Sequence, residues 1–139
     1  MKAALYEGSD ALVIRNVDIP RIQEQDDVIL KVQACSVCGT DVHILNKTFA
    51  ANTGIALGHE IVASVVETGT GVTNVRPGDR VIVKPNIYCG KCVYCLNDMT
   101  NHCENMVSIG VHIHGGFSEY FKAKEKVCYK ISHDLPTDT

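Results

Sequence analysis

The stretch "HEIVASVVETGTGVTNVRPGDRVIV" at residues 59–83 indicates the fold class, because it contains two runs of strand-forming residues with turn residues between them. Residues 59–68 and 79–83 are rich in Val and Ile, which favour β-strands. The intervening "GTGVTN" and "RPGD" contain the Gly, Pro, Asn and Asp typical of turns. "GTGVTN" lacks the third glycine of a phosphate-binding loop, and the "VRPGD" that follows cannot open a helix. We therefore predict a hairpin turn here.

Runs of the same kind recur along the chain and predict a mostly β domain. Further strands are predicted at residues 2–6, 11–19, 27–35, 117–124 and 126–131. Helical pattern is confined to "TDVHILN" at residues 40–46, with Thr40 as the predicted N-cap, and to a turn in the cysteine-rich segment. A chain of 139 residues, 45% of them apolar, can form one core, so residues 1–139 are predicted to be one domain.

Charge and apolar patterning argue against several classes of partner. The 13 basic and 16 acidic side chains give a formal net charge of −3, so the chain lacks the cationic surface that binds nucleic acid or anionic lipid. No apolar run approaches the ~20 residues that span a membrane. The N-terminal "MKAALYEGSDALVI" lacks the apolar core of a signal peptide. We expect a cytoplasmic protein whose seven cysteines, an odd number, are reduced thiols.

Four cysteines lie within "CGKCVYCLNDMTNHC": Cys89, Cys92, Cys95 and Cys103. Their spacing, C-x2-C-x2-C-x7-C, allows four sulfur atoms to bind one ion, and four thiolates leave no open position on a tetrahedral Zn²⁺. We interpret the segment as a structural zinc site. An iron–sulfur cluster is the alternative, but the bacterial ferredoxin pattern places the fourth cysteine after three residues and before a proline, where this chain has Glu104. Lys91 either offsets the charge of the thiolates or is a solvated loop residue.

Two other segments contain a mixture of metal-binding side chains. "CSVCGTDVH" at residues 35–43 and "LGHE" at residues 57–60 supply cysteine, histidine and carboxylate groups. This mixture, drawn from separate segments, is typical of a catalytic zinc whose fourth position stays open for water or a substrate oxygen. Taken alone, a cysteine is usually a small buried apolar residue, and a His-Glu pair is usually exposed. Their occurrence in one chain with the four-cysteine segment favours zinc.

The order of these motifs resembles the zinc-dependent medium-chain dehydrogenases, a family that includes alcohol, polyol and threonine dehydrogenases. Five blocks follow the family's order and approximate spacing: "CGTDVH", "GHE", "GTGVTNVRPGDRV", "PNIYCGKCVYCLNDMTNHC" and "GGFSEY". The resemblance covers essentially the whole chain. It implies a mostly β, GroES-like, partly open β-barrel with short helices and a zinc-binding loop, serving as a catalytic domain. It also implies a Rossmann coenzyme domain beyond residue 139, so the chain is expected to be a fragment.

The resemblance also implies roles for residues near the predicted catalytic zinc. Cys38 and His59 are similar to zinc ligands, and Glu60 is similar to the neighbouring carboxylate that coordinates directly or exchanges with water. Thr40 matches the hydroxyl group that hydrogen-bonds the substrate oxygen. The fourth ligand of this zinc is not predicted within the chain.

Two residues of the predicted helix have alternative interpretations. Asp41 is similar to the carboxylate that orients the histidine ligand, and it is equally an acid favoured by a helix N-terminus; the two roles are compatible. His43 matches the residue that relays a proton to solvent in some members, or it is an ordinary exposed helix residue. The sequence departs from the family at Ala63, where glycine is usual, and in residues 47–57, which lack the usual proline. The shape of the pocket near that loop is therefore not predicted.

Four further cysteines and histidines are not assigned to a site. Cys35 forms a C-x2-C pair with Cys38, which could make a zinc knuckle, but the family resemblance leaves Cys35 as a packing residue. Cys128 lies in an apolar run and is predicted to be in the core. His112 and His114, in "HIHGG", are interpreted as loop residues, although their composition could bind a metal.

Together these observations predict the catalytic domain of a dehydrogenase that oxidises a secondary alcohol or polyol by hydride transfer to NAD or NADP, with one catalytic and one structural zinc. The full-length enzyme is expected to be a homo-oligomer, and the isolated chain is expected to be inactive because nothing in it positions a nicotinamide ring. One rival function is a non-catalytic zinc module that binds another protein. A second rival is a quinone reductase-like relative without metal chemistry, against which Cys38, His59 and Glu60 argue.

Overall fold

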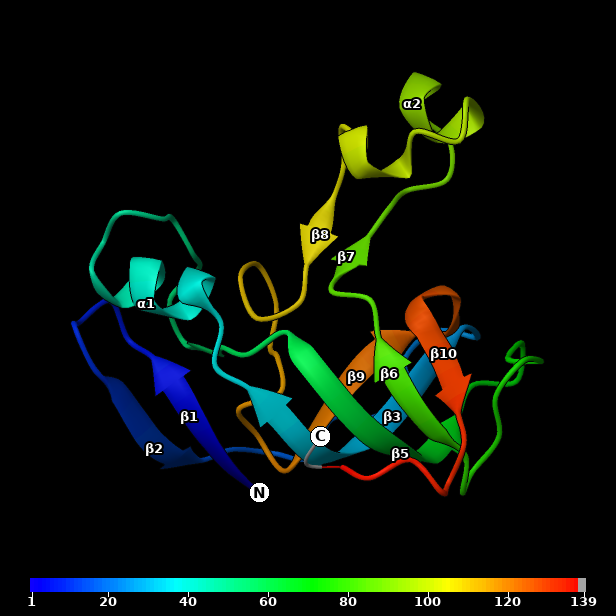
Figure 1. Ribbon diagram of the computed structural model, residues 1–139, viewed down its shortest axis with the longest axis horizontal. Coiled ribbons are helices and arrows are strands. Elements are labelled where there is room, and N and C mark those ends of the chain that lie inside the picture. Colours follow the sequence, from blue (N-terminus) through cyan, green and yellow to red (C-terminus); the bar gives the residue numbers. More distant parts are fainter. Residues whose placement is uncertain (138–139) are drawn as a thin grey trace.

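The computed structural model describes residues 1–137, and its architecture is mostly β (Figure 1). The strands form sheets of five, three and two strands. The five-stranded and three-stranded sheets make up the body of the molecule, and the two-stranded sheet leads from the body into a protruding lobe (Figure 1). None of the helices among residues 1–137 combines the length and the apolar character that crossing a lipid bilayer requires.

The five-stranded sheet has the order β10-β6-β5-β3-β9, with neighbouring strands antiparallel. Its strands are, in chain order, β3 (Asp27–Ser36), β5 (Glu60–Thr68), β6 (Arg80–Val83), β9 (Tyr120–Lys124) and β10 (Cys128–Ile131). β5 pairs with β6, with Ile61 opposite Val83, which confirms the two strands predicted from residues 59–83. The edge strands β9 and β10 do not pair with each other in the described part of the chain. The expected partly open β structure is therefore confirmed.

The loop between β5 and β6 packs against the segment that precedes β3. The backbone N–H of Gly69 donates to the carbonyl of Asp27 at 2.8 Å, and that of Gly71 donates to the carbonyl of Gln25 at 2.9 Å. A Cβ atom at Gly69 would lie 2.3 Å from the Gln25 carbonyl oxygen, so this approach requires glycine. The "GTGVTN" segment thus connects two strands and fixes the sheet to its neighbouring loop, as a hairpin connection does.

The remaining elements are short. The three-stranded sheet has the order β2-β1-β4 and contains β1 (Lys2–Tyr6), β2 (Leu12–Asn16) and β4 (Ile55–Ala56). The two-stranded ribbon consists of β7 (Asn86–Ile87) and β8 (Val107–Ser108). The helical elements are α1 (Gly39–Leu45), α2 (Val93–Leu96) and the 3₁₀ turns η1 (Thr100–His102) and η2 (Glu125–Val127).

Three strands are shorter than predicted. β2 ends at Asn16, opposite Lys2, the first residue of its partner β1. Val17 still exchanges two hydrogen bonds with Met1, so the last two residues of the predicted run lie beyond the end of this pairing. β9 begins later than predicted because residues 117–119 bind other segments: the N–H of residue 117 donates to the carbonyl of residue 57, residue 118 forms an isolated bridge with residue 3, and the N–H of residue 119 donates to the carbonyl of residue 2. The last predicted run opens with η2 before β10 begins. The two-residue strands β4, β7 and β8 were not predicted, because a residue pattern needs a longer run.

Helix α1 begins at Gly39, and its N-cap is Cys38 rather than Thr40. Asp41 sets this start, because its Oδ2 accepts a hydrogen bond from the Cys38 backbone N–H at 2.8 Å and its own N–H donates to the Cys38 carbonyl at 3.0 Å. An acid that reaches back to the N-cap N–H stands at the third helical position. The prediction of Thr40 as the N-cap is therefore wrong.

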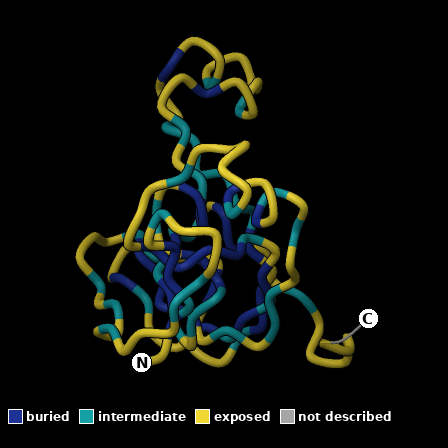
Figure 2. The backbone as a smooth tube through the Cα atoms, turned by 90° about the vertical axis from the view of Figure 1, so that its left-hand side faces the viewer, coloured by how far each residue is buried: buried dark blue, intermediate teal, exposed yellow. Residues whose placement is uncertain are grey.

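The main hydrophobic core lies along the five-stranded sheet. It contains Val28, Leu30, Ile61, Ala63, Val65, Val75, Val81, Val83, Ile109, Phe121, Ala123, Val127 and Cys128. Figure 2 shows the buried segments gathered in the body, whereas the lobe is mostly exposed. Ala63 is fully buried in this cluster, so the core accommodates the methyl group that replaces the family's usual glycine.

A buried carboxylate, Asp27, joins the start of β3 to the preceding loop and to β9. Its Oδ2 accepts hydrogen bonds from the backbone N–H groups of Gln23 and Glu24, both at 2.9 Å. Lys122 Nζ lies 3.1 Å from Oδ2, and Lys124 Nζ lies 3.0 Å from Oδ1. Burial alone would raise the pKa of Asp27, but these hydrogen bonds outweigh it and lower the pKa well below its ordinary value.

We expect Asp27→Asn to lower the free energy of unfolding at pH 7 by about 3 kcal/mol, because it leaves two lysines without their buried carboxylate. Asp27 has a lower pKa in the folded than in the unfolded state, where it is about 3.9. Its stabilisation is therefore complete above about pH 5 and is lost as the pH falls through the unfolded pKa toward the folded one. Urea unfolding at pH 7 and at pH 3.5 should show the gap between wild type and variant shrinking at the lower pH.

The matched control is Asp26→Asn, which removes a carboxylate that also binds Lys124 but whose side chain is 51% exposed. Exposed ion pairs contribute little, so this variant should lose only about 0.5 kcal/mol. Equal losses in the two variants, or a gap that does not depend on pH, would show that Asp27 is not the anchoring group.

Candidate metal centres and substrate pocket

The cysteine lobe (residues 89–103) protrudes from the body at the end of the β7–β8 ribbon (Figure 1). It contains α2 and η1. Its four sulfur atoms lie within 4.8 Å of one another, and they belong to Cys89, Cys92, Cys95 and Cys103. Among residues 1–137, which include every cysteine, all seven are free thiols. The structure therefore brings the predicted ligands together in a group that fits one tetrahedral ion.

Backbone N–H groups contact the sulfur atoms of this cluster. Those of Lys91 and Cys92 point to the Cys89 sulfur, at 3.5 and 3.4 Å, and the Cys89 N–H points to the Cys103 sulfur at 3.2 Å. The hydrogen bond from the Lys91 N–H is the largest cause of a pKa of about 6 for Cys89, well below the ordinary thiol value. Lys91 thus contacts the cluster through its backbone N–H. From the sequence, only a role for its side-chain charge had been considered.

Cys38, His59 and Glu60 form a second group, with one ligand atom from each within 4.8 Å of the others. The pairing of β3 with β5 explains this convergence. Ser36 lies opposite Glu60 in that ladder, so Cys38, just beyond the end of β3, reaches the start of β5. Cys38 and His59 are partly buried and Glu60 is exposed, so the group opens to the surface on one side.

Asp41 is buried beside this second group and contacts its histidine. Oδ1 of Asp41 accepts a hydrogen bond from the Gly58 N–H at 3.3 Å and lies 3.7 Å from Nδ1 of His59. That Nδ1 is buried and has no hydrogen-bond partner among the described residues. A proton on Nδ1 would face the carboxylate and leave Nε2 available to a metal. The donor set and its buried surroundings therefore fit a zinc ion.

A cavity of about 250 Å³ adjoins this group. It is lined by Thr40, Phe49, His59, Pro85, Asn86, Ser108, Ile109 and Val111. The hydroxyl of Thr40 lies 3.7 Å from the Cys38 sulfur, so the predicted substrate-binding hydroxyl is next to a predicted metal ligand. His43 is not among the lining residues; its Nδ1 lies 3.0 Å from Oγ1 of Thr48 on the exposed side of α1. The proton relay through His43 stays a prediction.

Apart from Thr40 and His59, the residues that line the cavity were not found from the sequence. Phe49 belongs to the loop near which the shape of the pocket was not predicted, and Asn86 and Ser108 belong to the ribbon β7–β8. Ile109 and Val111 follow that ribbon directly. The one signal in the sequence is the position of Asn86 within the "PNIYCGKC" block, next to the cysteine lobe.

The cysteines and histidines not assigned to a site lie outside both groups in the described structure. Cys35 packs against the main core, and burial raises the pKa of its thiol to about 12. Cys128 is part of that core, as predicted. His112 and His114 each accept a backbone hydrogen bond through Nδ1, which makes them part of the loop structure.

A larger groove of about 1010 Å³ lies beside residues 17–23 and the chain's N-terminal end. It shares no residue with either group of metal-binding side chains. Its charged lining residues, Asp18, Arg21, Glu67 and Lys122, alternate in sign and are interspersed with apolar ones. The smaller cavity, which His59 lines, is therefore the better candidate for chemistry.

Residues 24–133 match the alcohol dehydrogenase GroES-like domain family. The chain belongs to this family. The match confirms the resemblance inferred from the motifs, and with it the GroES-like fold. It includes both groups of metal-binding side chains and every residue of the cavity lining.

Known proteins similar to this GroES-like domain include several dehydrogenases. D-arabinitol dehydrogenase 1 of Uromyces fabae is 38% identical over 96% of the chain and 38% of its own length. L-threonine 3-dehydrogenase of Caldanaerobacter subterraneus subsp. tengcongensis is 40% identical over 95% of the chain and 38% of its own length. A zinc-binding dehydrogenase from Sinorhizobium meliloti 1021, whose crystal structure has NADP bound, superposes with a TM-score of 0.91 at 40% identity, covering 97% of the chain and 39% of that protein. The chain thus spans about two fifths of these relatives.

Proposed function

We propose that this GroES-like domain is the catalytic domain of a zinc-dependent dehydrogenase that oxidises a secondary alcohol or a polyol. One observation carries the proposal: a thiol, an imidazole and a carboxylate converge within 4.8 Å beside a cavity that His59 and Thr40 line. A mixed ligand set with one open side suits a catalytic zinc, whereas four cysteines suit a structural one. The identity of the relatives as alcohol, polyol and threonine dehydrogenases supports the same reaction class.

At the proposed centre, Cys38, His59 and Glu60 would hold the zinc ion. When bound, the ion acts as a Lewis acid that lowers the pKa of an alcohol oxygen. Asp41, whose Oδ1 lies 3.7 Å from Nδ1 of His59, would favour a proton on that nitrogen and so leave Nε2 for the ion. The hydroxyl of Thr40, which lies in the cavity wall beside Cys38, would hydrogen-bond the substrate oxygen and pass its proton outward, giving up its own hydroxyl proton as it takes the substrate's.

The apolar side chains of the cavity have a different task. The buried Ile109 and Val111 and the half-exposed Phe49 give the cavity an apolar wall, which would limit the access of water to the reacting carbon. A nicotinamide coenzyme, when bound, accepts that hydride. We place its binding site in a Rossmann domain beyond residue 139, consistent with relatives about two and a half times as long. The isolated chain should therefore bind zinc without turning over an alcohol.

Metal stoichiometry tests this proposal. The purified chain should contain two zinc ions, measured by plasma mass spectrometry after gel filtration, and Cys38→Ala should contain one. The control Cys35→Ala should keep both, because Cys35 lies outside the group despite its position in the C-x2-C pair. A single zinc in the wild type, unaffected by Cys38→Ala, would favour the non-catalytic zinc module instead.

A further inference from the structure

The cavity beside His59 contains two polar side chains that the proposed chemistry does not use. Asn86 and Ser108 stand on a wall that is otherwise apolar, made by Phe49, Pro85, Ile109 and Val111. A mostly apolar pocket with a few placed polar groups is the usual form of a small-molecule site, in which the polar groups give orientation and specificity. The pair is therefore a candidate for recognising a part of the substrate that does not react.

The backbone holds this pair in a fixed position. Asn86 and Ser108 are direct partners in the β7–β8 ladder. The Ile109 N–H donates to the Pro85 carbonyl at 2.9 Å, and the Ser108 N–H donates to Nδ1 of His112 at 2.9 Å. Side chains on such a cross-linked ribbon are preorganised, so a ligand need not order them on binding.

The two side chains bind each other and keep further hydrogen-bonding capacity. The Ser108 hydroxyl donates to Oδ1 of Asn86 at 2.9 Å. Among residues 1–137, neither Nδ2 of Asn86 nor the lone pairs of the Ser108 hydroxyl has another partner within the protein. The pair therefore offers two N–H donors and a hydroxyl acceptor, the complement of an alcohol group that both donates and accepts.

Resting on the proposed function, we infer that Asn86 and Ser108 select substrates with a second hydroxyl group, so that this site serves a short polyol rather than a simple secondary alcohol. A site built to hydrogen-bond a hydroxyl discriminates against an analogue that lacks it, because its own polar groups are then left unpaired. The cavity of about 250 Å³ has the volume of about eight water molecules, which suits a substrate of few carbons.

The test compares two five-carbon ligands, xylitol and 3-pentanol, which differ in the extra hydroxyl groups. The chain is loaded with zinc in the cysteine lobe and with cobalt(II) at the open site. Cobalt-enhanced relaxation of ligand protons, measured by NMR against the all-zinc protein, then reports binding beside His59. Asn86→Leu and Ser108→Ala should each weaken xylitol binding about tenfold, the loss of one or two hydrogen bonds, and change 3-pentanol binding less than about twofold.

The control Val107→Thr lies on the same ribbon but outside the cavity lining, and it should change neither affinity. Amide spectra of each variant establish that the ribbon is folded. Suppose that cobalt relaxes the protons of both ligands, but that Asn86→Leu weakens the binding of both equally or of neither. The inference is then overturned and the proposed function stands. If cobalt enhances the relaxation of neither ligand in the wild type, the proposed function is overturned and the inference with it.

Discussion

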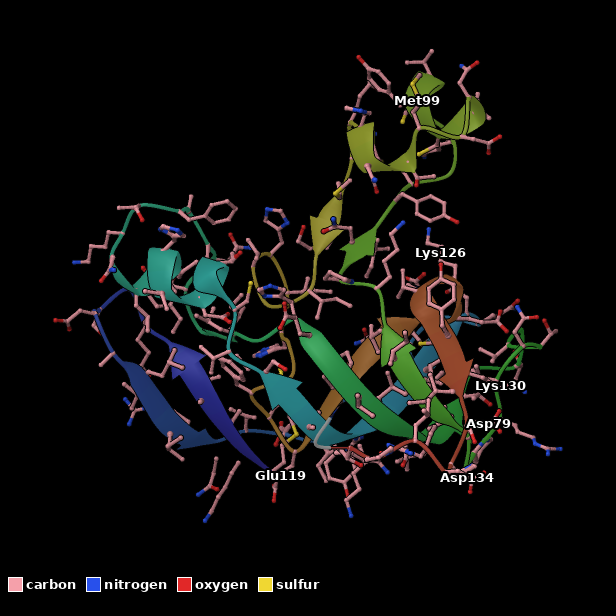
Figure 3. The ribbon with its side chains drawn as sticks, viewed as in Figure 1. Asp79, Met99, Glu119, Lys126, Lys130 and Asp134 are labelled. Atoms are coloured by element: carbon pink, nitrogen blue, oxygen red, sulfur yellow. The ribbon has the colours of Figure 1, made fainter. Side chains whose placement is uncertain are left out.

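Replacing Cys95 with serine should remove one zinc ion per chain, unfold the cysteine lobe and lower the melting temperature by about 10 °C or more. The lobe has almost no apolar interior of its own. Only Cys92 and Cys103 are buried within it, while Val93 is 59%, Leu96 is 72% and Met99 is 46% exposed. Figure 3 shows Met99 at the tip of the lobe. A segment without a core depends on its metal for structure.

The size of the effect follows from this dependence. Loss of a structural metal belongs with the mutations that cost about 4 kcal/mol or more. For a chain of this length, each kcal/mol shifts the melting temperature by about 2–4 °C. The lobe joins the body through the ribbon β7–β8, so the five-stranded sheet and the group at Cys38 should remain intact.

Calorimetry and zinc analysis measure the Cys95→Ser effect, with Lys91→Ser as the matched control. The backbone N–H of Lys91 contacts the Cys89 sulfur and survives the substitution, so the control should keep both zinc ions and melt within about 2 °C of the wild type. A Cys95→Ser variant that loses both ions, or that loses one without any change in melting temperature, would contradict a structural role for the lobe.

The cysteine lobe and the β5–β6 pair could be predicted from the sequence because their determinants are local. Cysteines spaced by two and seven residues can reach one ion from a single loop, whatever the rest of the fold does. Two Val- and Ile-rich runs separated by turn residues pair with each other for the same reason. The N-cap of α1 is also determined locally, but the prediction of Thr40 was wrong because it did not consider the side chain of Asp41. That side chain stabilises a helix start with Cys38 as the N-cap.

The residue types at 35–43 and 57–60 favoured a mixed zinc site, but the choice of Cys38, His59 and Glu60 came only from the resemblance to a family, because the geometry of the open site is not local. Cys38 and His59 meet only because Ser36 pairs with Glu60, and that register depends on the whole β3–β5 ladder with its irregularities. The cavity walls at Asn86 and Ser108 depend on a two-residue ribbon that no pattern marks. Residue type identified the possible ligands, whereas tertiary structure determined which of them meet.

A graded series of chelators should remove the zinc at Cys38, His59 and Glu60 well before the zinc of the cysteine lobe. The open group supplies three ligands from this chain, and one of them, Glu60, is exposed. The lobe supplies four, with Cys92 and Cys103 buried. Loss of a group that merely orients a ligand costs about 10–100-fold in metal affinity. The open site lacks a whole ligand, so its zinc affinity should be at least about 100-fold lower than that of the lobe.

Sensitivity to His59→Ala identifies which ion leaves first. This variant should lack the weakly held zinc and keep the tightly held one, so its titration should show only the second step. The control His43→Ala removes a histidine of α1 whose Nδ1 faces Thr48 outside the cavity lining, and it should show both steps unchanged. If both metals come off together, or if the first to leave does not depend on His59, then these three residues do not form the open site. The order of release therefore decides which of the two clusters is available to a substrate, since only an incompletely ligated ion can bind one.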